Sequence, residues 1–119
     1  MTILALLFFV KAGALALFVT PLWDVPDESG HLSYALDLAD GRGFPVYGRT
    51  LLAPEVRALW KAAAPGPLPF NWVAQHPPLY HLLAAPVALA GRAATADPIL
   101  RLKVPRLFTA AAAALALLL

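Results

Sequence analysis

The first apolar run of the chain, "ILALLFFVKAGALALFV" from Ile3 to Val19, decides the fold class. Only Lys11 interrupts it, and its extension to Trp23 gives about 20 residues, the length that crosses ~30 Å of hydrocarbon. A cleaved signal peptide is the competing interpretation, but no basic segment precedes the run and no small-residue cleavage site follows it. We therefore expect a first transmembrane helix at residues 3–23.

The composition agrees with a membrane protein. The 119 residues are 61% hydrophobic and 13% charged, whereas soluble domains carry about 25% charged residues. The net charge is +2, and the Lys and Arg residues form no basic stripe, which argues against nucleic-acid binding. The chain has no cysteine, which excludes disulfides, thiolate metal sites and a cysteine nucleophile.

Two later segments predict further membrane helices. Residues 77–91, "PPLYHLLAAPVALAG", are short for a span and contain Pro86, which neighbouring helices in a bundle can accommodate. Residues 99–119 form the third segment and run to the last residue without a polar stop. We therefore expect an all-α integral membrane helical bundle with three transmembrane helices, as the N-terminal fragment of a longer polytopic protein.

The distribution of Lys and Arg predicts the orientation. The short loop at 92–98 and its flanks hold four basic residues, Arg92, Arg101, Lys103 and Arg106. This bias places that loop in the cytoplasm, the N-terminus inside, and the loop at 24–76 on the outer side of the cytoplasmic membrane. Within the outer loop, residues 28–40 and 54–64 predict amphipathic helices that lie along the interface, the first capped by Asp27 and ended by Gly41.

Asp27, Glu28 and His31 form a polar cluster at the start of the predicted 28–40 helix. Asp27 and His31 are one helical turn apart on one face, with Glu28 at its edge. They can bind a divalent cation, deprotonate a hydroxyl, or simply cap the helix, which stabilises it by about 0.5–2 kcal/mol. For a metal the candidates are Asp27, Glu28, His31 and His76, but no spacing identifies one.

A second polar cluster lies just before the 77–91 segment. Gln75 and His76 precede the Pro77–Pro78 pair, at the same outer boundary as Asp27. The sequence therefore predicts that the two clusters meet at the outer ends of neighbouring helices. His81 is expected to pack between helices. The aromatic residues at the boundary are expected to form an interfacial belt: Trp23, Trp60, Trp72 and Tyr80.

The order of these motifs carries a resemblance to a known superfamily. A membrane helix followed by "DESGHLSYALDLADGRGFP", "QHPPLYHLL" and "RLKVPRLF" resembles the GT-C polytopic glycosyltransferases, in particular bacterial relatives of protein O-mannosyltransferases and of the lipid A aminoarabinose transferase. The resemblance implies transfer of a sugar, with inversion, from a polyprenyl-phosphate carrier to a protein, lipid or glycan acceptor outside the cytoplasmic membrane.

The resemblance also suggests roles for individual residues. Asp27 matches the loop acid taken as the general base, and Glu28 is its companion. By their position, and not by the resemblance, His31, Gln75, His76 and Arg57 are further candidates for substrate binding. His31 and His76 are not general features of the superfamily, and they can instead mark a subfamily, bind a divalent metal or pack in the fold. The alternative is a non-enzymatic polytopic protein, such as a transporter or assembly subunit, whose acidic loop binds a cation or supports the fold.

Overall fold

The computed structural model describes residues 1–63 and 70–119, with side chains for 1–60 and 70–119, and these parts are all-α. The predicted 54–64 helix thus ends in a segment outside the described residues. The elements, in chain order, are α1 (Thr2–Ala14), the π-helical turn η1 (Leu15–Val19), α2 (Glu28–Ala39), α3 (Pro54–Ala63), the 3₁₀ turn η2 (Trp72–Gln75), α4 (Leu79–Ala94), α5 (Pro98–Lys103) and α6 (Arg106–Ala116).

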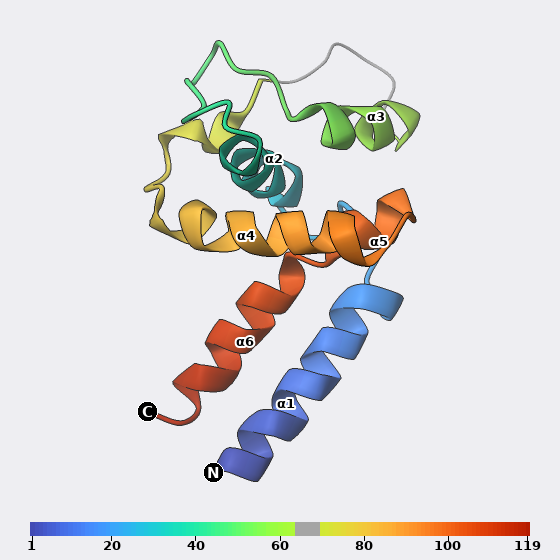
Figure 1. The fold of residues 1–119 in the computed structure, drawn as a ribbon, viewed down its shortest axis with the longest axis vertical. Helices are drawn as coiled ribbons and strands as arrows, with labels where there is room; N and C mark the ends of the chain where they lie inside the picture. Colours follow the sequence, from blue (N-terminus) through green and yellow to red (C-terminus); the bar gives the residue numbers. More distant parts are fainter. Residues whose placement is uncertain (64–69) are drawn as a thin grey trace.

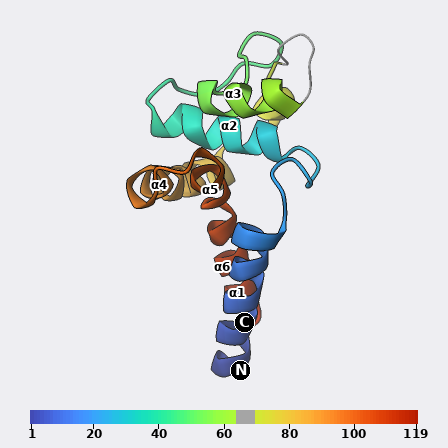
Figure 2. The same cartoon turned by 90° about the vertical axis from the view of Figure 1, so that its right-hand side faces the viewer.

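The helices form two parts (Figure 1). α1 and α6 pack side by side as an antiparallel hairpin, with the two chain termini at the same end. α4 and α5 lie across the other end of this hairpin, and α2 packs on α4. Figure 2 shows α4, α2 and α3 as successive layers above the hairpin.

The first apolar run is helical throughout. Among the described residues, Thr2–Val19 is the one helix long and apolar enough to cross a membrane, and only 11% of this segment is buried. Its exposed surface carries the charged Lys11 and many large apolar side chains, including Ile3, Leu4, Leu7, Val10 and Phe18. A hairpin with such a surface is suited to a lipid environment.

The other two predicted spans differ from the expectation. α4 lies across α1 and α6 instead of alongside them, and its 16 residues extend only about 24 Å, less than the ~30 Å of a bilayer core. The 99–119 segment is two helices, α5 and α6, separated at Val104 and Pro105. Proline at this point lacks the N–H that would continue the ladder. Among the described residues, the predicted bundle of three membrane spans is therefore not confirmed.

Two arginines of the basic segment contact acids of other helices. Arg92 pairs with Asp40 and Glu55, and Arg106 pairs with Glu28. The arginines at both ends of the 92–106 segment therefore lie on the same side of the hairpin as the 24–76 segment.

α2 is the central helix and not a surface one. Its observed range agrees with the predicted 28–40, and Gly41 follows it with φ +70°, as expected for a left-handed C′ glycine. The polar side expected of an amphipathic interfacial helix is not exposed, however, because Ser33 and Asp37 are 0% and 3% exposed. α3 and η2 cover that face, and Ser33 Oγ accepts the Ala53 N–H at 3.0 Å.

Candidate functional site

Asp27 immediately precedes α2 but does not cap it. Its backbone is left-handed, with φ 61°, and its side chain makes no capping hydrogen bond, whereas a capping residue normally has an extended backbone. Its Oδ1 instead accepts a hydrogen bond from Trp72 Nε1 at 2.6 Å. The capping role expected from the sequence is therefore wrong, and the exposed carboxylate is held by a residue of η2.

The turn before α2 is strained. Trp23 (φ 69°) and Asp27 (φ 61°) are the only non-glycine residues with positive φ in the part of the chain that the structure describes. Such conformations cost about 1–3 kcal/mol each, and persist where surrounding contacts over-determine them. The contacts that hold this turn come from the side chains of Glu28 and Arg106.

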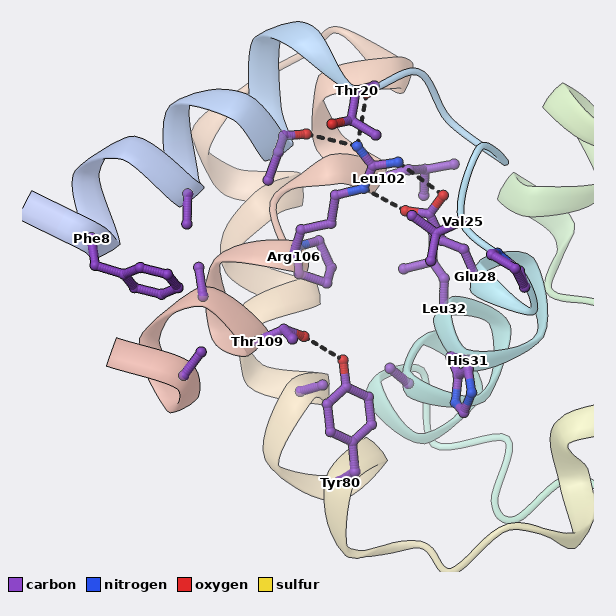
Figure 3. Close-up of a pocket in the computed structure, with 18 residues that line it drawn as sticks. Phe8, Thr20, Val25, Glu28, His31, Leu32, Tyr80, Leu102, Arg106 and Thr109 are labelled. Carbon is purple, nitrogen blue, oxygen red and sulfur yellow. Dashed lines mark hydrogen bonds and ion pairs between the residues drawn. The ribbon is translucent and has the colours of Figure 1, made fainter. Parts of the chain in front are cut away.

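Glu28 and Arg106 form a half-buried ion pair in the centre of Figure 3. The Arg106 Nε and Nη2 groups both donate to the Glu28 carboxylate. The same guanidinium also donates to backbone carbonyls at the end of the first apolar helix. Glu28 is therefore bound to a cation and is not free as a second base.

The three histidines of the chain meet beside Asp27. His31 Nδ1 lies 3.0 Å from His81 Nε2 in a hydrogen bond, and the ring centre of His76 is 5.3 Å from that of His31. Burial lowers the pKa of His31, His76 lowers it further, and Asp27 raises it. The structure thus brings together the two polar clusters that are about 45 residues apart in sequence.

His81 is buried as expected, with 1% exposure, and stacks on Tyr34 at 3.9 Å between ring centres. Its contact with His31 was not anticipated, since helical periodicity places it away from His76. Tyr80 OH lies 2.9 Å from Thr109 Oγ1 on α6. Three of the residues expected in the aromatic belt instead pack together, because Trp60 contacts both Trp23 and Trp72.

The remaining candidates are not part of this cluster. Gln75 is exposed at the end of η2. Arg57 lies near Asp37, toward the other end of α2. Among the residues with described structure, no group of three or more Asp, Glu, His or Cys side chains can hold a metal ion. The metal candidates Asp27, Glu28, His31 and His76 therefore do not converge as one ligand set.

A cavity of about 440 Å³ connects this cluster with the membrane-type hairpin. Most of its wall is apolar and comes from α1, α2, α4 and α6 (Figure 3). Its polar side chains are largely paired: Glu28 with Arg106, Tyr80 with Thr109, and His31 with His81. The cavity suits an apolar chain better than a charged group, because none of the described residues that line it is an unpaired cation or anion.

Comparison with known protein families, curated proteins and solved structures gives no match for this chain. Its function is therefore argued from the site alone.

Two residues of the site were not identified as such from the sequence. Arg106 was noted only as part of a basic segment, and its partner Glu28 is 78 residues away. Trp72 was assigned to the interfacial belt. A buried or half-buried indole N–H usually finds an acceptor, which predicts a hydrogen bond but does not identify Asp27 as the partner.

Proposed function

We propose that this chain carries the general base of a membrane glycosyltransferase. The enzyme would move a sugar from a polyprenyl-phosphate donor to an acceptor hydroxyl on the outer side of the cytoplasmic membrane. The observation that carries the proposal is the state of Asp27: its carboxylate is exposed, strained and held by Trp72 instead of capping α2. Residues that surrounding contacts hold in a strained backbone conformation are typical of active sites.

The chemistry requires one positioned carboxylate. The acceptor hydroxyl attacks the anomeric carbon of the donor and passes its proton to Asp27. The bond from that carbon to the phosphate oxygen breaks, and the polyprenyl phosphate leaves with the electron pair, so the configuration inverts. A general base in such a step contributes typically 10²- to 10⁴-fold to the rate.

The cavity supports a lipid-borne substrate. It extends from Phe8 and Ala12 on α1 to Glu28 and His31 on α2, and it is lined by the residue on either side of Asp27, Pro26 and Glu28, but not by Asp27 itself. An amphiphile whose apolar chain lies between α1 and α6 would therefore bring its polar end to the turn that carries Asp27, next to the cavity residues Pro26 and Glu28. His31 and the exposed His76 offer ring nitrogens for sugar hydroxyls at that end.

The leaving phosphate needs cations or N–H donors where charge builds up. Arg106 cannot serve it, because its N–H groups already bind Glu28 and backbone carbonyls. Within the proposal, that stabilisation comes from groups other than Arg106. Glu28 correspondingly moves from companion base to a residue that supports the fold.

The second candidate is the non-enzymatic membrane protein with a structural acidic loop. The Glu28–Arg106 pair favours it, since this pair joins α2 to α6 without any substrate. Both candidates predict that loss of Glu28 harms the protein. They differ on Asp27, because only the enzyme needs its carboxylate.

The test is Asp27→Asn in the full-length protein. Asparagine keeps an oxygen for the Trp72 N–H but cannot act as a base, so we expect transfer to fall at least 100-fold, in line with the usual contribution of a general base. Membranes that contain the protein and endogenous acceptors are incubated with radiolabelled undecaprenyl-phosphate mannose. A separate incubation uses radiolabelled undecaprenyl-phosphate aminoarabinose. Transfer of label to the acceptor fraction is measured.

Asp24→Asn is the matched control, because Asp24 is an exposed acid in the same loop and should keep wild-type transfer. The thermal unfolding midpoint of both variants should equal that of the wild type within experimental error. Wild-type transfer by Asp27→Asn would remove Asp27 from the mechanism and favour the non-enzymatic candidate.

A further inference from the structure

Glu28 and Arg106 are the charged groups of the site that the proposed reaction does not use. They join the end of the first apolar helix, the strained turn, α2 and α6. We infer that Arg106 is a positioning residue, which acts through Glu28 to hold the 20–27 turn and thereby to present the Asp27 carboxylate. This inference rests on the proposed role of Asp27 as the base.

The hydrogen bonds of Arg106 use the whole guanidinium. Nη1 donates to the carbonyls of Ala16 at 2.7 Å and Thr20 at 2.8 Å. Nη2 donates to the Pro21 carbonyl at 2.7 Å and to Glu28 Oε2 at 2.9 Å, and Nε donates to Glu28 Oε1. Since a guanidinium has five N–H groups, this set satisfies all of them.

Glu28 holds the same turn from the other side. Its Oε2 accepts the backbone N–H of Trp23 at 2.9 Å. The turn is thus fixed through the carbonyls of Thr20 and Pro21 and through the N–H of Trp23. Asp27 lies between these anchors and the first turn of α2, and both strained residues of the turn, Trp23 and Asp27, lie in this anchored segment.

Because the Glu28–Arg106 pair is largely buried, it contributes more to the positions of its neighbours than to the stability of the fold. The Arg106 and Glu28 side chains are 13% and 11% exposed. Desolvation offsets much of the attraction in a pair removed from water, so such a pair adds little net stability. Its directional hydrogen bonds still fix the position of each partner.

Only arginine can make this set of contacts. The contacts run in several directions from one planar group and include a two-point contact with a carboxylate. Lysine has the same charge but three N–H donors on one nitrogen and no planar fork. Arg106→Lys therefore keeps the charge while removing the geometry.

The experiment measures the position of Asp27 without using catalysis. The Trp72 indole N–H signal is followed by ¹H–¹⁵N NMR in the full-length protein, and is assigned with Trp72→Phe. Asp27→Ala defines where this signal lies once the hydrogen bond to Asp27 is lost. For Arg106→Lys we expect the signal to move at least halfway from its wild-type position toward that one.

The kinetic arm uses the same variant with undecaprenyl-phosphate sugar as donor. We expect kcat to fall about 10- to 100-fold, the range expected from a misplacement of roughly 1 Å, while the donor KM changes less than twofold. A residue that only stabilises the fold would lower the unfolding temperature without moving either the Trp72 signal or kcat. That result would overturn the inference.

Arg92→Lys is the matched control. Arg92 is another partly buried arginine that binds two carboxylates, Asp40 and Glu55, but at the opposite end of α2. It should lower the unfolding temperature and leave both the Trp72 signal and kcat unchanged. If Arg106→Lys does not fold, Glu28→Gln replaces it, with the same expected movement of the Trp72 signal.

The two ideas fail separately. A Trp72 signal that moves in a protein without transferase activity supports the positioning of Asp27 and removes the proposed function. A transferase that needs Asp27 but keeps both its Trp72 signal and its kcat in Arg106→Lys supports the function and overturns the positioning role.

Discussion

The two ends of α2 carry the same kinds of residue and use them differently. At the C-terminal end, Asp37 and Asp40 both bind Arg42, at 2.7 Å and 2.5 Å, and Asp40 also binds Arg92. At the N-terminal end, Glu28 is bound by Arg106, but Asp27 has no cation partner among the described residues and meets only the Trp72 indole.

The difference separates charges that hold the fold from one that does not. The acids at the C-terminal end connect α2 to α4 and, through Arg92 and Glu55, to α3. The hydrogen bond from Arg92 lowers the pKa of Asp40, as expected for a carboxylate stabilised in its charged form. The N-terminal end instead keeps one exposed carboxylate in a strained backbone, an arrangement that fold stability alone does not favour.

The largest expected effect tests this separation directly. Asp40→Asn is compared with Asp27→Asn in the same transfer assay. Asp40→Asn should leave transfer unchanged and lower the free energy of unfolding by about 1 kcal/mol or less, since Asp40 is 23% exposed and such pairs contribute little. Asp27→Asn should lower transfer at least 100-fold and leave the free energy of unfolding unchanged. Equal loss of transfer in both variants would show that the two ends do not differ in function.

Glycines at the two ends give the next effect. A Cβ on Gly30 would lie 2.4 Å from Val73 Cγ2, whereas one on Gly41 would meet nothing within 4 Å. Gly30→Ala should therefore destabilise the protein by overpacking, about 1–3 kcal/mol, and displace η2 with Trp72. Gly41→Ala should cost only the strain of a left-handed alanine, about 1–2 kcal/mol.

The readout for this glycine pair is chemical denaturation together with the Trp72 indole signal. Both variants should lower the midpoint, but only Gly30→Ala should move the signal. An unchanged signal in Gly30→Ala would mean that η2 does not depend on close packing at Gly30.

The smallest effect concerns pH. Burial and His76 lower the pKa of His31 below the ordinary histidine value of 6.5, against the opposing effect of Asp27. The folded protein therefore favours neutral His31, so stability is fully present above about pH 6.5 and is lost as pH falls through the lower folded pKa. Unfolding temperatures at pH 8 and pH 5 should differ less in His31→Gln than in the wild type, and an equal difference in both proteins would contradict this.

The C-terminal end should respond in a different pH range. The lowered pKa of Asp40 makes its contribution disappear only as pH falls below about 3.8. Burial raises the pKa of Asp37 despite Arg42, which gives a contribution of opposite sign. The Asp40 titration therefore lies below the pH range used for His31, and the Asp37 contribution is common to His31→Gln and the wild type, so it cancels in their comparison.

Sequence reasoning succeeded where the cause was local. The apolar run at residues 3–19, the range of α2 and the glycine that ends it follow from composition and from residues close in the chain. The spans predicted at 77–91 and 99–119 are not confirmed, because the prediction took apolar length alone as evidence of a span. A helix can be apolar because it packs on another helix, as α4 does on α2.

The candidate site shows the same division. The sequence identified Asp27, Glu28, His31 and His76, and expected the clusters to meet. It could not assign different roles to Asp27 and Glu28, because adjacent acids before a helix have the same local pattern. It also read Arg57 as part of the site, although the residue lies near Asp37.

By itself, the sequence determined an all-helical chain with a membrane-type first helix and a second helix that ends at Gly41, because apolar content and a helix-ending glycine act locally. Only the tertiary structure decided which acid is neutralised and which is exposed. That choice depends on Arg106 and Trp72, which lie 78 and 45 positions from their partners. Packing between helices, and not spacing along the chain, sets the distances between such groups.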